Sequence, residues 1–145
     1  MAEETLSDGR VVRVIGPVVD AEFPPDAMPV ISTALPIDVG LEGATRVITC
    51  EVAQHIGDGM VRAIALKPTD GMIRGAHVKN TGGPISVPVG EGVLGHVYNV
   101  LGEPLDTSPD NIHAADRWPI HREPPPFDEL EPKQVMLETG IKVID

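Results

Sequence analysis

The feature that most constrains the fold is a pair of strand-like runs joined by an Asp-Gly dipeptide. In the first run, Ile48, Cys50 and Val52 alternate with more polar neighbours, and residues 60–66 form a second apolar run. Asp58-Gly59 lies between the runs, and a two-residue hairpin turn needs the positive φ that these residue types tolerate. The spacing therefore predicts an antiparallel hairpin over residues 46–66.

Further short runs rich in β-branched residues precede and follow this hairpin. They cover residues 10–15, 18–23, 30–39, 76–81 and 85–89, with Gly or Pro residues between them. Short strands at regular spacing predict a small antiparallel barrel or sandwich, and a barrel also removes exposed sheet edges. Pro17 separates the first two runs. Because proline lacks an N–H group, it suggests a sheet edge or a bulge at that position.

The composition agrees with a mainly β chain of about one domain's length. Its 145 residues include 18 Val and 12 Ile but only 9 Leu, and β-branched side chains fit pleated, half-buried surfaces. Gly and Pro number 15 each, which predicts many turns and argues against a helical bundle. No apolar run reaches the roughly 18 residues that a membrane-spanning helix needs.

The pattern divides the chain into three parts. Residues 1–9 read as a flexible polar tail, residues 10–83 contain most of the strand pattern, and residues 84–145 hold nine of the 15 prolines. The N-terminus has neither the apolar core of a secretory signal nor the arginines of a transit peptide.

The part beyond residue 83 has little regular pattern. Stretches 103–111 and 116–132 predict irregular coil, and only residues 133–145 have a helical pattern. The chain finishes on an apolar run with no polar tail behind it, whereas chain ends usually tolerate solvent. We therefore expect that the sequence is cut there.

Charge and aromatic content argue against nucleic-acid binding. The formal net charge is −11, and the four aromatic residues provide no stacking platform. Cys50 is the only cysteine, so no internal disulfide can form. Because Cys50 shares a strand face with Ile48 and Val52, we expect a small buried apolar side chain rather than a nucleophile.

One glycine motif has the form of a dinucleotide-binding fingerprint. Gly90, Gly92 and Gly95 match G-x-G-x-x-G, and Asp116 lies about 20 residues further on. That fingerprint must open a helix, but the residues after Gly95 are β-like, so a turn with close backbone packing is the favoured interpretation. The phosphate-loop pattern G-x-x-x-x-G-K-[ST] is absent from the sequence, and Pro84 after Gly82-Gly83 has no N–H group for a phosphate.

No set of side chains forms a catalytic or metal-binding pattern. His113 and Asp116 have a spacing that could chelate a metal on a helix, but their Asn-, Asp- and Pro-rich surroundings disfavour one. The acidic run 128–131 is most simply a solvated face. We predict no catalytic, cofactor-binding or metal-binding residue in this chain.

Several long stretches together resemble the beta-subunit family of the rotary proton ATP synthase. The matching stretches are residues 10–20, 61–66 with Thr69-Asp70-Gly71 and Arg74-Gly75, 81–90, 99–106, 120–127 and 137–145. The alpha subunit and the vacuolar-type relatives share the barrel and the Gly-Glu-Pro region but lack the stretch at 63–66 with Thr-Asp-Gly. His96-Val97-Tyr98 departs from the family pattern, which more often has Arg and Ile there.

The resemblance implies a small antiparallel β-barrel over residues 10–83 and the start of an α/β nucleotide-binding domain over 84–145, cut before the phosphate loop. The parent subunit makes ATP from ADP and phosphate, driven by a proton gradient. It binds Mg-ATP or Mg-ADP through residues that lie downstream, and the fragment alone is expected to be inactive. The implied partners are alpha subunits and further beta subunits in a ring, and the gamma subunit of the central stalk.

Two other assignments remain open. The chain could be a stand-alone β-barrel binding or scaffold module without catalysis, or an oligonucleotide-binding barrel, which the charge and the few aromatics disfavour. The resemblance and the missing transit peptide imply a peripheral position at the cytoplasmic face of a bacterial plasma membrane, with a plastid thylakoid as the second option.

Overall fold

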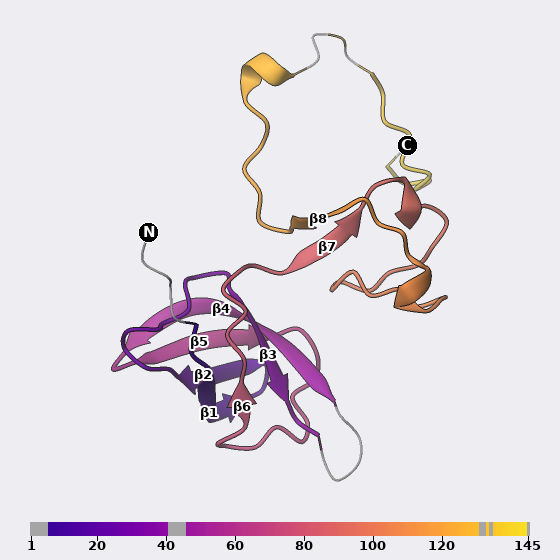
Figure 1. Ribbon diagram of the computed structural model, residues 1–145. Helices are drawn as coiled ribbons and strands as arrows, with labels where there is room; N and C mark the ends of the chain where they lie inside the picture. Colours follow the sequence, from indigo (N-terminus) through magenta and orange to yellow (C-terminus); the bar gives the residue numbers. More distant parts are fainter. Residues whose placement is uncertain (1–5, 41–45, 131–132, 134, 145) are drawn as a thin grey trace.

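The computed structural model describes residues 6–40, 46–130, 133 and 135–144. Six strands form a closed antiparallel barrel, and the chain then continues into an extended second region (Figure 1). The mainly β fold class and the small antiparallel barrel predicted from the sequence are confirmed. Among the described residues, no helix has the length and apolar character needed to cross a membrane.

The barrel strands follow one another around the wall in the order β1-β2-β5-β4-β3-β6, and β6 pairs with β1 to close the ring. Every pairing between neighbouring strands is antiparallel. The strands are β1 (Gly9–Ile15), β2 (Val18–Glu22), β3 (Ala34–Asp38), β4 (Val47–Gly57), β5 (Met60–Ala65) and β6 (His77–Val78).

The predicted hairpin is the longest paired element of the barrel. β4 pairs with β5 from Cys50↔Ala65 to Gly57↔Met60, which leaves Asp58-Gly59 as the two-residue turn. Asp58 has a φ of 53° and Gly59 a φ of 73°, so both turn residues are left-handed as expected. The prediction for residues 46–66 is confirmed.

Alternate residues of the strands fill the barrel interior. Ile48, Cys50 and Val52 of β4 are buried against Val19 of β2 and Val61 of β5, among other apolar side chains. Burial raises the pKa of the Cys50 thiol to about 12, because the charged thiolate is disfavoured away from water. The expectation that Cys50 is a buried apolar side chain is confirmed.

The segment around Pro17 differs from the expected edge or bulge. Gly16 and Pro17 form the turn of a second hairpin, in which Ile15 pairs with Val18. Gly16 has a φ of 56°, and Pro17 lies in the turn, where no ladder donor is needed. β1 is irregular nearer its start, between Val11 and Arg13.

Two predicted strands are shorter than expected. In the run 30–39 only Ala34–Asp38 is a strand, because residues 30–33 turn: Thr33 N–H donates to Val30 O, and Ser32 has a φ of 68°. In the run 76–81 only His77–Val78 is a strand. Of the predicted tail 1–9, residues 1–5 lie outside the described part, and Gly9 is the first residue of β1.

The second region contains a two-stranded sheet that the sequence did not fully predict. β7 (Ser86–Val89) pairs with β8 (Asp116–Pro119), so the expectation of coil is wrong for the start of 116–132. The reason is that β8 pairs with a strand distant in sequence, and the guanidinium of Arg117 also donates to Ser86 O at 2.6 Å. Three short 3₁₀ helices accompany the sheet: η1 (Glu91–Val93), η2 (Pro109–Asn111) and η3 (Phe127–Glu129).

The helical pattern expected over 133–145 is not realised in its described residues. Residues 141–144 form a single turn in which Ile144 N–H donates to Ile141 O at 2.8 Å. Gly140 has a φ of 73°, which is incompatible with a continuous right-handed helix. Gln134 and Asp145 lie outside the described residues.

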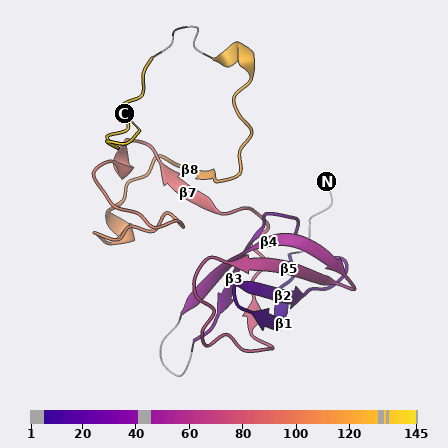
Figure 2. The same cartoon turned by 180° about the vertical axis from the view of Figure 1, so that it is seen from behind.

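The second region contacts the barrel at one end, as both views show (Figures 1 and 2). Ala34 of β3, Ile85 and Leu101 form a small buried cluster separate from the barrel core. Two polar contacts join the same regions: His121 Nε2 lies 3.1 Å from Glu51 Oε1, and Lys67 Nζ lies 3.4 Å from Glu103 Oε2.

The Asp58-Gly59 turn provides a direct test of what fixes the hairpin. We expect Gly59→Ala to lower the free energy of unfolding by about 1–3 kcal/mol, because a side chain at a positive φ is strained. A Cβ at Gly59 would also lie 2.9 Å from Phe23 O. Gly83→Ala is the control, since its Cβ would meet nothing within 4 Å. Urea unfolding of both variants gives the comparison, and equal stability would contradict the role of the turn.

Candidate functional site

The outer wall of the barrel has an ion-paired triad across three strands. The register pairs Asp20 of β2 with Arg13 of β1 on one side and with Arg62 of β5 on the other. Arg13 Nη2 lies 2.6 Å and Arg13 Nε 2.9 Å from Asp20 Oδ2. Arg62 Nε lies 2.8 Å from Asp20 Oδ1, and its Nη2 lies 3.1 Å from Oδ2. Both guanidinium groups therefore hold one carboxylate through two donors each.

The two arginines cover Asp20, which is only 3% exposed although it belongs to the outer face. The side chains of Arg13 and Arg62 remain 55% and 35% exposed. Hydrogen bonds from Arg62 and then Arg13 hold the pKa of Asp20 below its ordinary value, and burial partly opposes this effect. Asp20 is thus ionised at neutral pH, and the triad fixes β1, β2 and β5 to one another.

An apolar row lies beside the triad on the same outer face. Two residues further along the strands, the register places Ile15 next to Val18, and Val18 next to Ile64. Ile15 is 59% exposed and Ile64 is 37% exposed. A fixed, partly apolar sheet face of this kind can pack against another protein surface, and its carboxylate, Asp20, is already paired with two arginines. We call Arg13, Ile15, Val18, Asp20, Arg62 and Ile64 the β1-β2-β5 face.

The glycine motif at 90–95 is a tight turn, as the sequence favoured. Only the three-residue helix η1 follows Gly90, and a Cβ on Gly92 would lie 2.2 Å from His113 O. The backbone of His113 therefore packs directly against Gly92, which is the close backbone packing expected at this position.

Contacts with carboxylate or carbonyl oxygens are made by His55, His77, His96 and His121. His55 Nε2 lies 2.7 Å from Pro29 O, and His96 Nδ1 lies 2.8 Å from Asp106 Oδ2. Hydrogen bonding from His96 lowers the pKa of Asp106. In the part of the chain that the structure describes, no three His, Cys, Asp or Glu side chains gather into a metal-binding group, and none is found around His113 and Asp116.

Sequence reasoning missed the β1-β2-β5 face, although part of its signal was present. If Gly16-Pro17 is taken as a two-residue turn, Ile15 pairs with Val18 and the same register pairs Arg13 with Asp20. The third member, Arg62, comes from β5 and could not be found without the barrel topology.

Asp20 provides a test of the triad. We expect Asp20→Asn to lower the free energy of unfolding by about 1–2 kcal/mol at pH 7, because two charge-assisted interactions are lost and the arginines are partly solvated. The ionised Asp20 carboxylate contributes its full share to the free energy of unfolding above pH 3.8, the ordinary carboxyl pKa. This contribution is lost as pH falls through the lowered pKa of Asp20 in the folded state. Below about pH 4, the free energy of unfolding of Asp20→Asn should therefore depend less on pH than that of the parent chain.

Thermal unfolding from pH 2 to pH 7 measures this difference. Asp110→Asn, which makes the same change at an exposed site in η2, is the matched control. Parallel pH profiles for the parent chain and Asp20→Asn would contradict the role of the triad.

The chain is similar to a known protein family over the barrel. Residues 11–82 match the model described as ATP synthase alpha/beta family, beta-barrel domain. The matched residues include all of β2–β6 and most of β1, and thus nearly the whole closed barrel.

Proposed function

Because residues 11–82 belong to the beta-barrel domain of the ATP synthase alpha/beta family, we propose that this chain is the N-terminal part of the catalytic beta subunit. Members of this family assemble with other subunits in a membrane-associated complex that makes or hydrolyses ATP. On this proposal, the barrel helps to hold an alternating ring of alpha and beta subunits. The beta assignment rests on the sequence stretch 63–66 with Thr69-Asp70-Gly71.

The observation that carries the ring role is the composition of the β1-β2-β5 face. Its ionic triad is held by four hydrogen bonds, so the strands beneath it are fixed before any partner arrives. The neighbouring row exposes Ile15 and Ile64, whose burial against another barrel is favourable by roughly 25 cal/mol per Å² of apolar surface. Modest contacts of this kind add up when a closed ring repeats them.

Nucleotide chemistry belongs, on the same proposal, to residues outside this sequence. Phosphoryl transfer requires positioned cations around the γ-phosphate, and the phosphate-loop pattern is absent from the 145 residues. Mg-ATP and Mg-ADP would therefore bind to the complete subunit, where the gamma subunit of the central stalk changes the sites in turn. The site of action would be the cytoplasmic face of a bacterial plasma membrane, or the thylakoid of a plastid.

A stand-alone barrel that acts as a binding or scaffold module is the second candidate. The exposed apolar row also suits a partner other than a neighbouring subunit. The two candidates differ in whether the β1-β2-β5 face is needed for a hexameric ring.

The first test concerns nucleotide binding by the chain itself. We expect isothermal titration of the 145-residue polypeptide with Mg-ATP to show no saturable binding, because it lacks a phosphate loop. ATP hydrolysis should also stay at the level of a protein-free blank. A stoichiometric isotherm with micromolar affinity would contradict the assignment of nucleotide chemistry to residues beyond this sequence.

The second test concerns ring assembly in the complete subunit mixed with its alpha partner. We expect Ile15→Glu to reduce the hexamer population several-fold in mass photometry, because a charge would be buried in the contact. Ile73→Glu is the control: Ile73 is 66% exposed, lies in the connection between β5 and β6, and is not one of the residues that define the face.

Deletion of residues 10–83 extends the same experiment. We expect folded nucleotide-binding domains that still bind ATP but form little hexamer. Stable hexamers from the deletion variant would show that the barrel is dispensable for assembly and would favour the scaffold alternative.

A further inference from the structure

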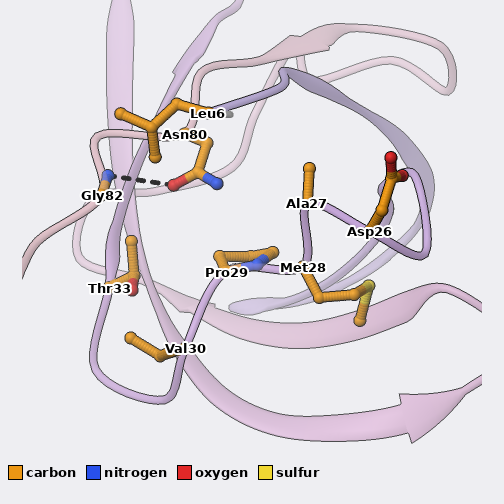
Figure 3. Close-up of a pocket in the computed structure, with 9 residues that line it drawn as sticks. All are labelled: Leu6, Asp26, Ala27, Met28, Pro29, Val30, Thr33, Asn80 and Gly82. Carbon is orange, nitrogen blue, oxygen red and sulfur yellow. Dashed lines mark hydrogen bonds between the residues drawn. The ribbon is translucent and has the colours of Figure 1, made fainter. Parts of the chain in front are cut away.

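A small cavity lies at one end of the barrel, away from the β1-β2-β5 face. Its volume is about 90 Å³, and three separate segments line it. Figure 3 shows Leu6, Asn80, Gly82 and Thr33 along one side, and the loop 26–30 between β2 and β3 along the other. This space is therefore bordered by the residues just before β1, the β2–β3 loop and the residues that follow β6.

Two polar side chains with very little solvent exposure line this cavity. Thr33 is 1% exposed, and its hydroxyl has no hydrogen-bond partner within the described part of the chain. Asn80 is 6% exposed, and its Oδ1 accepts the Gly82 N–H at 3.0 Å. That bond orients the amide so that its nitrogen points into the cavity (Figure 3). A buried hydroxyl group is almost always paired, so the unpartnered Thr33 Oγ1 points to a ligand in this cavity, and the Asn80 amide provides a second polar group in the lining.

The remaining walls define the chemistry of that ligand. Leu6, Ala27, Pro29 and Val30 provide an apolar surface, so a strongly charged molecule would lose its hydration without compensation. The Asp26 carboxylate at the rim further disfavours anions. An amide donor and a hydroxyl, which can donate or accept, together suit a neutral hydroxyl group.

We propose that this cavity is a binding site for a small hydroxyl ligand. The ligand oxygen accepts a hydrogen bond from Asn80 Nδ2 and shares one with Thr33 Oγ1. The cavity volume of about 90 Å³ is several times the roughly 10–15 Å³ that one ordered water requires, so the site can hold ordered waters or one short-chain alcohol. Water and alcohol are two sources of the same chemistry, and the experiment below separates them.

Occupancy of the cavity has a structural consequence for the N-terminal segment. Asp8 Oδ1 accepts the Asn80 N–H at 3.1 Å, and Asp8 Oδ2 lies 3.0 Å from His77 Nε2. Asn80 therefore contacts the N-terminal segment with its backbone and the ligand with its side chain. A bound hydroxyl ligand would connect the residues before β1 to the β2–β3 loop, next to the β6–β1 pairing that closes the barrel.

The test uses the whole 145-residue chain and nuclear magnetic resonance. Water–protein cross-relaxation should give long-lived water signals at the Asn80 side-chain amide and at the Gly82 amide. Titration with 2-propanol should then give saturable shifts of the Met28, Thr33 and Gly82 amides if an alcohol can replace the water. Water signals without saturable shifts assign the site to water alone. A chain that shows neither response contradicts the proposal.

Thr33→Val is the informative variant, because it keeps the shape of the side chain and removes the hydroxyl. We expect loss of the water signals, or at least a tenfold weaker alcohol response. Thr49→Val, which makes the same change on β4 outside the cavity, is the control. If Thr33→Val does not fold, Ala27→Leu provides the second variant, since a larger side chain fills the space from the loop side. Unchanged signals in either folded variant overturn the proposal.

Discussion

The barrel depends on a seam made by its shortest strand. His77–Val78 pairs with Gly9 and Arg10 of β1 on one side and with Ile37 of β3 on the other. Backbone bonds on either side of β6 lengthen the seam: Val11 N–H donates to Ala76 O at 2.9 Å, and Lys79 N–H donates to Pro36 O at 3.0 Å. Without these bonds, β1 and β3 would be exposed sheet edges and the apolar interior would open to water.

Gly9 lies at this seam, where it pairs with Val78, and it also packs closely against the end of β2. A Cβ on Gly9 would lie 2.5 Å from Glu22 O and 2.7 Å from the Phe23 ring. Glycine therefore allows β1 to begin directly against the end of β2, where Phe23 is buried in the core. The same start of β1 is held by Asp8, whose carboxylate contacts the residues of β6 and just after it. The residues that close the barrel therefore also hold the segment just before β1 in place.

The barrel and the second region differ in how much of their apolar side chains is buried. In the barrel, most apolar side chains of the strands point inward, and those exposed on the outside include Ile15 and Ile64 beside the Arg13–Asp20–Arg62 triad. In the second region, most large apolar side chains are exposed, including Leu94, Val100 and Phe127. The buried cluster of Ala34, Ile85 and Leu101 is small by comparison. This difference agrees with a barrel that forms its own core and a following region whose apolar surface belongs to further contacts.

Local sequence was sufficient for features whose cause is local. The Asp58-Gly59 turn requires positive φ at two adjacent residues, and the alternation around Cys50 sets which side of β4 faces the core, so both were predictable. The tight turn at Gly90–Gly95 was predictable for the same reason.

Tertiary structure decided what depends on residues distant in sequence. β8 forms only because β7 lies beside it, and Arg62 reaches Asp20 across 42 positions. Local sequence could not predict that two residues of β6 close the barrel, or that three segments line one cavity. Both features arise only when segments distant in sequence meet in space.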